Sequence, residues 1–254
     1  MLDSMSELST KSALPVNRLR DLLFPPACLF CQRPLDSGDQ SQACCNDCFA
    51  SVHIWPTSVC HQCGQELPEA MAPGPCGRCL NQSPVQCRTL NLYTYQGPVR
   101  DAILSWKLNG HEAAVGWLLQ SAIPRLKQEL PADVLLLPVP MPLSRMRKSG
   151  QHHAANLCHW IADAVGCHWS WQILRRQGEQ QRQSALSGEA RRKNLRKAFI
   201  LSDDYRARIE GIRSVCIVDD IMTTGSTLHY AARACNRLGV PVSVLSLART
   251  TQKR

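Results

Sequence analysis

The sequence predicts an α/β protein in which a doubly wound parallel sheet follows a small cysteine-rich module. Two observations carry this prediction. Short apolar runs alternate with helix-like segments over residues 91–247, and eight cysteines before residue 80 form four Cys-x-x-Cys pairs. The 254 residues suit one α/β domain beside a smaller unit. We therefore expect an N-terminal segment (1–26), a cysteine-rich module (27–88) and an α/β domain (89–254).

Composition and charge narrow the class of protein. No stretch of 18 or more apolar residues occurs, and the first 26 residues lack the apolar region of a signal peptide. The expectation is a cytoplasmic chain without membrane insertion. Residues 1–90 carry a net charge of −2, whereas residues 91–254 carry +11. A basic C-terminal part favours a polyanionic ligand such as pyrophosphate or nucleic acid.

The cysteine pairs are typical of zinc sites. A Cys-x-x-Cys turn presents two thiolates at the spacing that tetrahedral Zn²⁺ requires, and two such turns supply four ligands. A disulfide scaffold would need an oxidising compartment, and four pairs in series do not match a thioredoxin-type redox motif. We expect a double zinc ribbon with two structural Zn²⁺ ions, held by Cys28, Cys31, Cys45, Cys48, Cys60, Cys63, Cys76 and Cys79.

The ligand pairing stays open at this stage. The simplest arrangement joins the first pair to the second and the third to the fourth, but an interleaved arrangement has the same spacing. Cys44 competes with Cys45, because either thiol could act with Cys48. Prolines interrupt the segment and leave it little apolar core, so bound metal would supply much of its folding free energy.

The α/β elements follow in order along the second part of the chain. The apolar pattern predicts strands at 91–95, 134–137, 169–174, 215–218 and 242–247, and helices at 99–108, 111–129, 154–165 and 188–197. Ser187 is the expected N-cap of the helix at 188–197. Pro138-Val139-Pro140 ends the strand at 134–137, because proline cannot donate to a β-ladder.

The segment from Val215 to Thr227 carries the strongest functional signal. An apolar strand ends in Asp219 and Asp220, a loop rich in hydroxyl groups follows (Thr223, Thr224, Gly225, Ser226, Thr227), and a helix begins. Backbone N–H groups at a helix N-terminus suit a phosphate, while adjacent carboxylates suit sugar hydroxyls or hydrated Mg²⁺. A phosphorylated ribose would satisfy both halves. The plainer interpretation is an ordinary strand–loop–helix unit of a doubly wound sheet.

This segment resembles the signature of the type I phosphoribosyltransferases, which bind 5-phosphoribosyl-1-pyrophosphate (PRPP). The resemblance implies that Asp219 and Asp220 contact the ribose hydroxyls as the catalytic acidic pair. It implies that the loop from Thr223 to Thr227 holds the 5-phosphate, and that Mg²⁺ accompanies PRPP. The turn from Pro138 to Met141 would lie at the pyrophosphate.

A narrower resemblance covers nearly the whole chain. The chain is similar to the ComF family, also called ComF/GntX, in the order of its pieces. These are the four cysteine pairs, Tyr95 to Arg100 with Lys107, Leu137 to Met141, Leu174 to Arg176, Gln183 to Leu186, Arg191 to Asn194, and the PRPP loop. The resemblance implies a double zinc ribbon followed by a phosphoribosyltransferase-like domain. It implies pyrophosphate-binding roles for Lys107 and Arg176, and a part in natural competence, with single-stranded DNA and a helicase-like uptake protein as partners.

One loop departs from the family pattern. Many members carry Arg-Gly-Phe-Asn-Gln-Ala after the Pro-Val-Pro turn, whereas this chain has Ser149-Gly-Gln-His-His-Ala154. The Arg, Asn and Gln functions are absent or replaced by His152 and His153. These histidines could serve as acid/base groups or phosphate contacts, and the plainer interpretation is that they are surface side chains without a role. Two functional hypotheses therefore stand together. One is a phosphoribosyltransferase whose acceptor the sequence does not identify, and the other is a non-catalytic adaptor for single-stranded DNA that uses the PRPP fold as a scaffold or sensor.

Overall fold

The computed structural model of the protein describes residues 25–36, 39, 43–68, 74–142, 144, 146–147, 150–177 and 197–251. The chain divides into two compact units, Met1–Ser51 and Val52–Arg254. In the described part of the first unit, an isolated bridge joins Ala27 to Pro34, and the short helix α2 spans Asn46–Ser51. The second unit holds the third and fourth cysteine pairs together with the sheet.

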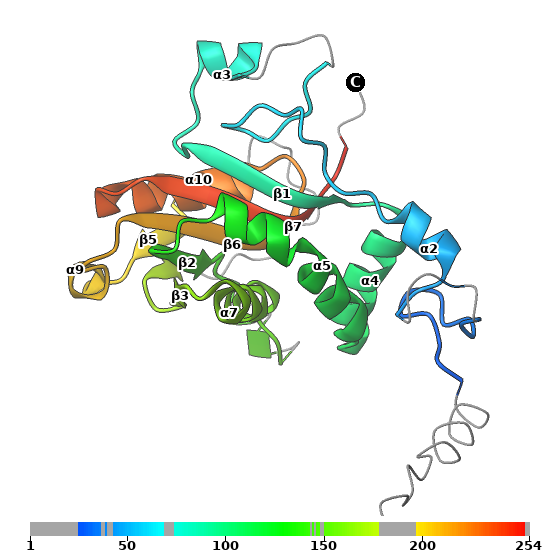
Figure 1. The fold of residues 1–254 in the computed structure, drawn as a ribbon. Coiled ribbons are helices and arrows are strands. Elements are labelled where there is room, and N and C mark those ends of the chain that lie inside the picture. The colour runs from blue at the N-terminus through cyan, green and yellow to red at the C-terminus, as the bar shows by residue number, and fades with distance from the viewer. Residues whose placement is uncertain are drawn as a thin grey trace, which may run out of the picture. The chain divides into compact units, whose positions relative to one another are not determined.

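A five-stranded parallel sheet forms the centre of the second unit (Figure 1). Its strands lie in the order β1-β7-β6-β2-β3, and every neighbouring pair is parallel. The strands span Arg88–Thr94 (β1), Val134–Pro138 (β2), His168–Trp169 (β3), Ser214–Met222 (β6) and Val242–Arg249 (β7). Since parallel strands need crossover connections, helices cover the sheet on both faces, as the sequence predicts.

The helices divide between these two faces. On one side lie α4 (Gly97–Asn109), α5 (Ala113–Glu129) and α7 (His153–Val165), and on the other lies α10 (Ser226–Cys235) (Figure 1). A small antiparallel pair, β4 (Leu174–Arg176) and β5 (Phe199–Leu201), packs with α10. The part of this unit that the structure describes also holds the short helices α3 (Gly77–Asn81) and α9 (Tyr205–Arg208) and the 3-10 helix η1 (Asn236–Leu238).

Alternation along β6 builds the core on both faces of the sheet. Val215 and Ile217 join a buried cluster with α10, to which the helix contributes Leu228, Ala231, Ala232 and Cys235. These residues recur at helical spacing, so they form one apolar stripe. Burying Val215, Ile217 or Leu228 contributes about 1.5–3 kcal/mol each, while the smaller Ala231 and Ala232 contribute less and let the helix approach the strand closely. The start of α10 is thereby held beside the end of β6.

The structure departs from the predicted secondary structure at 169–174, and it does not describe most of the segment predicted as a helix at 188–197. The single strand predicted over 169–174 is wrong, because β3 ends at Trp169 and β4 begins at Leu174. The Ser170 N–H still bonds the Leu136 carbonyl, but the Ser170 hydroxyl then accepts from the Gln172 N–H and turns the chain. The helix predicted at 188–197, its cap Ser187 and the motifs at 183–186 and 191–194 fall outside the described residues, except for Lys197.

Candidate functional site

The acidic pair lies at a topological switch point of the sheet. β6 leads through α10 to β7 on one side, whereas its other neighbour β2 leads through α7 to β3 on the opposite side. Ligands of open parallel sheets bind in the crevice beyond the carboxyl ends of two such strands. β2 ends at Pro138, opposite Val218, while β6 continues along β7 to Met222. Asp219 and Asp220 therefore stand on β6 just beyond the end of β2.

The turn after β2 closes one side of this crevice. The Val139 N–H donates to the Val218 carbonyl over 2.9 Å, immediately before the acidic pair. Pro140 and Met141 follow, and both are partly exposed. The Pro138–Met141 turn predicted from the sequence thus begins beside Asp219.

Lys107 reaches the acidic pair from a helix far away in the sequence. Its Nζ lies 2.7 Å from Oδ2 of Asp220, and the two side chains are only 27% and 15% exposed. Lys107 sits in the last turn of α4, which ends at Gly110 in the left-handed conformation. The structure therefore joins three residues that the sequence predicts for the site, and an ammonium group already faces the carboxylates.

The two carboxyl groups differ in their electrostatics. Asp219 Oδ1 accepts a hydrogen bond from the Asp220 N–H at 3.0 Å. Burial, reinforced by the negative charge of Asp220, raises the pKa of Asp219 to about 8, against the lowering effect of Lys107. A cationic or hydrogen-bond-donating ligand would offset this cost and favour the ionised pair.

The loop after β6 presents hydroxyl and backbone N–H groups at the start of α10. Thr223 and Thr224 are exposed, and the Thr224 and Ser226 hydroxyls lie 3.0 Å apart. Gly225 precedes the helix with φ of 77°, which favours glycine. A Cβ at Gly225 would also lie 2.5 Å from Cε of the buried Met222. The predicted residues Thr223 to Thr227 thus form a tight turn whose N–H groups open the ten-residue helix.

The expectation that His152 and His153 lie on the surface is wrong. His152 is the N-cap of α7, where its Nδ1 accepts from the Ala155 N–H at 3.1 Å. His153 is 5% exposed, and its ring meets the ring of Trp106 edge-on with centroids 4.5 Å apart. Burial lowers the pKa of both histidines, while the charge of Asp220 raises it. No pattern in the sequence signals these roles, because histidine is an uncommon cap.

Arg176, the other basic residue predicted for the site, lies in the antiparallel pair β4–β5 and not in the parallel sheet. Arg176 ends β4, where its guanidinium carbon lies 5.5 Å from the centroid of the Phe199 ring. Arg175 is exposed and its Nε donates to the Gln172 carbonyl. Lys107 is the predicted cation that a direct ion pair joins to the acidic residues.

The eight cysteines of the four pairs form two separate clusters. The first contains Cys28, Cys31, Cys45 and Cys48, and the second contains Cys60, Cys63, Cys76 and Cys79, with all four sulfurs of each within 4.8 Å of one another. Four thiolates at about 2.3 Å from a tetrahedral Zn²⁺ lie roughly 3.8 Å apart. The Cys31–Cys45 and Cys63–Cys76 sulfurs are 3.8 and 3.7 Å apart, so the residues fit the metal. The simple pairing is confirmed, and Cys45 rather than Cys44 belongs to the first cluster.

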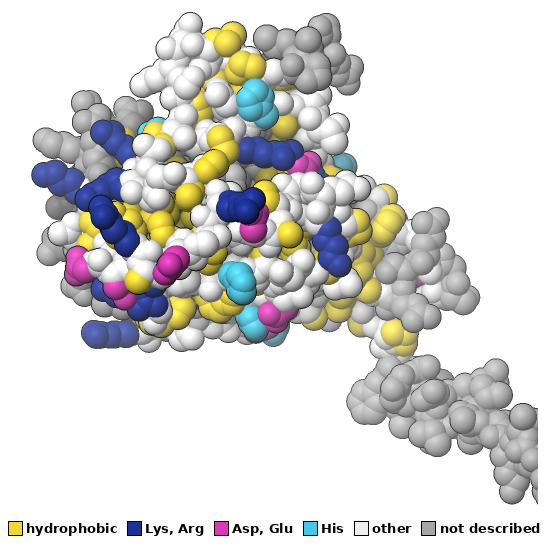
Figure 2. All heavy atoms as spheres, turned by 60° about the vertical axis from the view of Figure 1, so that its left-hand side comes forward, with side chains coloured by type: hydrophobic (Ala, Val, Ile, Leu, Met, Phe, Trp, Pro, Cys, Tyr) yellow, Lys and Arg dark blue, Asp and Glu magenta, His cyan; other side chains and the backbone are white. Residues whose placement is uncertain are grey.

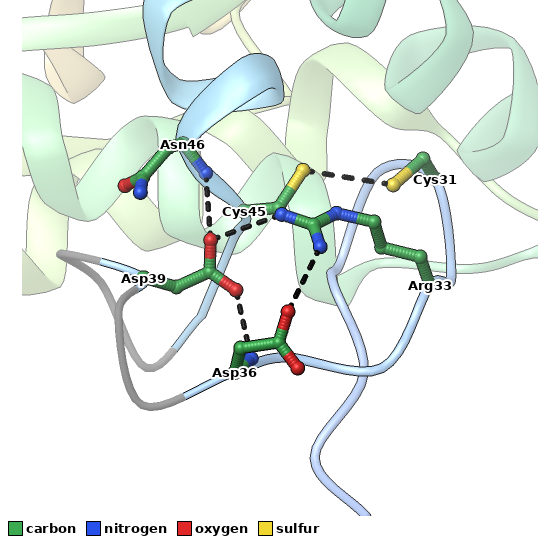
Figure 3. A network of polar contacts seen from close by, with 6 residues as sticks. All are labelled: Cys31, Arg33, Asp36, Asp39, Cys45 and Asn46. Atoms are coloured by element: carbon green, nitrogen blue, oxygen red, sulfur yellow. Dashed lines mark hydrogen bonds and ion pairs between the residues drawn. The ribbon is translucent and has the colours of Figure 1, made fainter.

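A polar network supports the first cluster (Figure 3). The Asp39 carboxylate accepts from Arg33 at 3.0 Å and from the backbone N–H groups of Asp36 and Asn46. A hydrogen bond from Arg33 is the main cause that lowers the pKa of Cys45, to about 6. The lowered pKa favours the thiolate form of Cys45, which is the form that binds zinc. Arg33 follows the first cysteine pair and Asn46 lies within the second, so the network connects the two pairs of this cluster.

The second cluster is built into the edge of the sheet. The turn from His61 to Gly64 follows Cys60, and each of its four backbone carbonyls accepts a hydrogen bond. The donors are the Thr89 N–H for His61, Thr89 Oγ1 and Gln86 Nε2 for Gln62, Arg249 Nη1 for Cys63, and Trp55 Nε1 and Asn91 Nδ2 for Gly64. Thr89 and Asn91 lie in β1, and Arg249 lies in β7. Gln86 lies just before β1, and Trp55 lies before the turn itself. The site therefore shares its backbone hydrogen bonds with the parallel sheet.

The sequence predicts no transmembrane helix, and the helices of the structure bear on this prediction. Within the described ranges, none of the helices combines the length and apolar character that crossing a bilayer requires.

Known proteins resemble this chain both in its cysteine-rich part and along most of its length. The family model described as "Double zinc ribbon domain" matches residues 19–80. A "DNA utilization protein YhgH" of Salmonella typhi is 32% identical over 235 residues, which cover 90% of this chain and 99% of that protein. A "Competence protein F" of Haemophilus influenzae is 28% identical over 211 residues, which cover 81% of this chain and 90% of the relative.

A solved structure and a further relative complete the comparison. Adenine phosphoribosyltransferase from Saccharomyces cerevisiae superposes with a TM-score of 0.31 at 15% identity, covering 56% of this chain and 72% of that one. A "Competence protein ComFC" of Bacillus subtilis is 24% identical over 208 residues, or 80% of this chain and 81% of the relative. The identity of 32% along almost the whole of both chains shows that the protein belongs to the ComF/YhgH family, and the structure joins two four-cysteine clusters to a parallel α/β sheet.

Proposed function

We propose that the crevice at the end of β6 binds the ribose 5-phosphate part of PRPP together with Mg²⁺. The observation that carries the proposal is the meeting of Asp219, Asp220 and Lys107 beside the hydroxyl-rich start of α10. One side of such a site can accept hydrogen bonds from sugar hydroxyls, and the other can donate to a phosphate. Few ligands besides a phosphorylated sugar present both groups at adjacent positions.

Each part of the ligand has a counterpart in the proposal. The loop from Thr223 to Thr227 holds the 5-phosphate through backbone N–H groups and hydroxyls, and the acidic pair holds the ribose hydroxyls. Mg²⁺ neutralises pyrophosphate charge when bound, and half-buried carboxylates are ligands that it accepts, directly or through water. The pyrophosphate lies toward the Pro138–Met141 turn, and Lys107 supplies positive charge there. Arg176 on β4 is proposed for the same role on the family resemblance alone.

Lys107 has a second role in this proposal. In the ligand-free chain its ammonium neutralises Asp220 at 2.7 Å. When the ribose and its cation take this place on the carboxylate, Lys107 is released toward the pyrophosphate. The lysine thus keeps the acidic pair charge-compensated before binding and meets the anionic end of the ligand afterwards.

The proposal is that the chain binds PRPP, and it does not extend to phosphoribosyl transfer. The loop that carries Arg, Asn and Gln in many family members carries His152 and His153 here, and these side chains cap α7 and pack on Trp106. The residues proposed to hold the ribose phosphate lie outside this loop, whereas His152 and His153 are engaged in the fold. A part in natural competence agrees with the names of two relatives, "Competence protein F" and "Competence protein ComFC". The cytoplasmic location and the helicase-like partner in DNA uptake are parts of the proposal that rest on the family resemblance.

The test is a binding measurement on a double variant. Asp219→Asn with Asp220→Asn should abolish PRPP binding in the presence of Mg²⁺, measured by isothermal titration calorimetry, because amides neither attract a cation nor accept as strongly. The control is Asp101→Asn, a carboxylate on the exposed side of α4. Wild-type affinity in the double variant would contradict the proposal. Pyrophosphate release with candidate acceptors, with and without single-stranded DNA, then distinguishes binding from phosphoribosyl transfer.

A second candidate function is an adaptor for single-stranded DNA. Exposed arginines gather on α9, α10 and η1, namely Arg206, Arg208, Arg233 and Arg237, with the partly exposed Tyr205 among them. Figure 2 shows several Lys and Arg side chains on one part of the face drawn, with Asp and Glu side chains among them; one such acidic residue, Asp204, pairs with Arg208. Binding through phosphates weakens steeply with salt. Fluorescence anisotropy with an oligonucleotide at several salt concentrations tests this, and a flat profile would count against it.

A further inference from the structure

Arg249 is a buried cation at the edge of the sheet. It lies in β7 and is 4% exposed, and its Nη1 donates to the Cys63 carbonyl over 2.6 Å. The guanidinium carbon lies 5.4 Å from the centroid of the Trp55 ring. Arginine keeps its positive charge in proteins, so this contact places a permanent cation beside the second cysteine cluster.

No carboxylate neutralises this cation. Among the described residues, no Asp or Glu forms an ion pair with Arg249, whereas the arginines that do pair with a carboxylate have side chains at least 35% exposed. The groups that approach the guanidinium are the Cys63 carbonyl and the Trp55 ring, and neither carries a full negative charge. An uncompensated buried charge costs several kcal/mol, so a countercharge is expected nearby.

A zinc centre supplies that countercharge. Four thiolates around one Zn²⁺ leave a net charge of about −2, and Cys60, Cys63, Cys76 and Cys79 have the spacing for it. A hydrogen bond to the carbonyl of a ligand residue also fixes the turn that presents its sulfur. We propose that Arg249 is the countercharge of the zinc centre at Cys60, Cys63, Cys76 and Cys79, and locks this centre to the sheet.

Trp55 and Gly64 pack closely around the Arg249 guanidinium. Trp55 covers the guanidinium and donates from Nε1 to the Gly64 carbonyl at 3.1 Å. A Cβ at Gly64 would lie 2.9 Å from Arg249 Nη1, so the turn and the guanidinium pack without spare room. The first cluster lies in the other unit and has Arg33 beside it, which makes it an internal reference that Arg249 does not touch.

Zinc release distinguishes the two centres. In the full chain, a chromogenic chelator should remove one of two zinc ions at least ~10-fold faster from Arg249→Met than from wild type, and leave the other unchanged. Arg249→Lys keeps the charge without the planar fork and should fall between. Arg213→Met, whose side chain is 86% exposed, is the control. The assignment is checked in a chain with Cys28→Ser and Cys31→Ser, which retains the second centre. Unchanged release from folded Arg249→Met and Arg249→Lys would overturn the proposal.

The sign of a stability change separates a countercharge from ordinary packing. Arg249→Met should lower the unfolding temperature of the zinc-bound chain. In a Cys63→Ser background that lacks the second zinc, the same substitution should raise it, because the buried cation has lost its countercharge. Scanning calorimetry measures both. A decrease of equal size in both backgrounds would show that Arg249 contributes packing alone.

Discussion

At the scale of single residues, two neighbouring histidines near the acidic pair act in different ways. His152 caps α7 through an unprotonated Nδ1, whereas His153 fills space against Trp106. Burial lowers the pKa of both histidines, and the negative charge of Asp220 partly offsets this lowering. The start of α7 is therefore coupled electrostatically to the end of β6. The capping role is the more accessible one to test, because it depends on a single lone pair.

We expect His152→Ala to lower the free energy of unfolding by about 1 kcal/mol, the usual value of an N-cap, while His152→Asn retains most of it. Burial lowers the pKa of His152, so the cap is intact at neutral pH. The difference between wild type and His152→Ala should shrink as the pH falls below ~6.5 and the folded-state imidazole gains its proton. Urea denaturation at several pH values measures this. His159→Ala, an exposed residue on the same helix, is the control, and an equal loss there would contradict the role.

Residue types in the motif were predictable, but their contacts were not. Asp219, Asp220 and the loop to Thr227 are adjacent in sequence, so their chemistry can be inferred from spacing alone. Lys107 came only through the family resemblance. Its ion pair with Asp220 depends on the fold bringing α4 beside β6, and no local pattern encodes that approach. The buried state of His153 is likewise a property of the packed core.

At the scale of elements, the junction of β6 and α10 sets the geometry of the proposed phosphate site. β6 extends past Val218 because β7 continues to pair with it, through Asp219 with Ser246 and Ile221 with Ala248. Sequence alternation ends the strand at Val218, since the acidic residues interrupt the apolar run. The pairing partner therefore decided a boundary that local sequence could not.

Gly225 allows a matched comparison with Gly239. Both glycines have a left-handed φ, 77° and 74°, but only Gly225 would place a Cβ against Met222. Each change to alanine should cost about 1–2 kcal/mol for the backbone. Gly225→Ala should lose about 1 kcal/mol more, because the buried Met222 must shift, and it should also weaken PRPP binding. Thermal denaturation and calorimetric titration measure the two effects. Equal stability losses with unchanged binding would show that the turn tolerates the side chain.

At the scale of the whole molecule, the four cysteine pairs do not serve one module alone. Their spacing treats the pairs as equivalent, and it correctly predicts two clusters with four sulfurs each. It contains no information that the third and fourth pairs belong with the sheet, because the contacts run from the turn at His61–Gly64 to residues of β1 and β7. Loss of the two metals should therefore have different consequences.

Cys63→Ser should lower the unfolding temperature of the α/β unit by more than ~5 °C, because the turn that it anchors carries hydrogen bonds to the sheet. Cys31→Ser should leave that transition unchanged, since its cluster lies in the other unit. Differential scanning calorimetry, with hydrogen exchange at β1 as a local readout, compares the two. If a chelator instead unfolded both clusters together and left the sheet transition in place, the second centre would be independent of the sheet.

The segment that leads into the second cluster also protects the sheet from other chains. β1 is an outermost strand, and residues 53–61 cover its free side: the Trp55 N–H donates to Leu92, the Thr94 N–H to His53 and the Thr89 N–H to His61. An uncovered edge strand offers unpaired N–H and C=O groups to any passing strand and is a common start of aggregation. A chain truncated at residue 89 would thus expose β1 along its length. In this protein, the ribbon segment occupies the hydrogen-bonding groups of β1 that another strand could otherwise use.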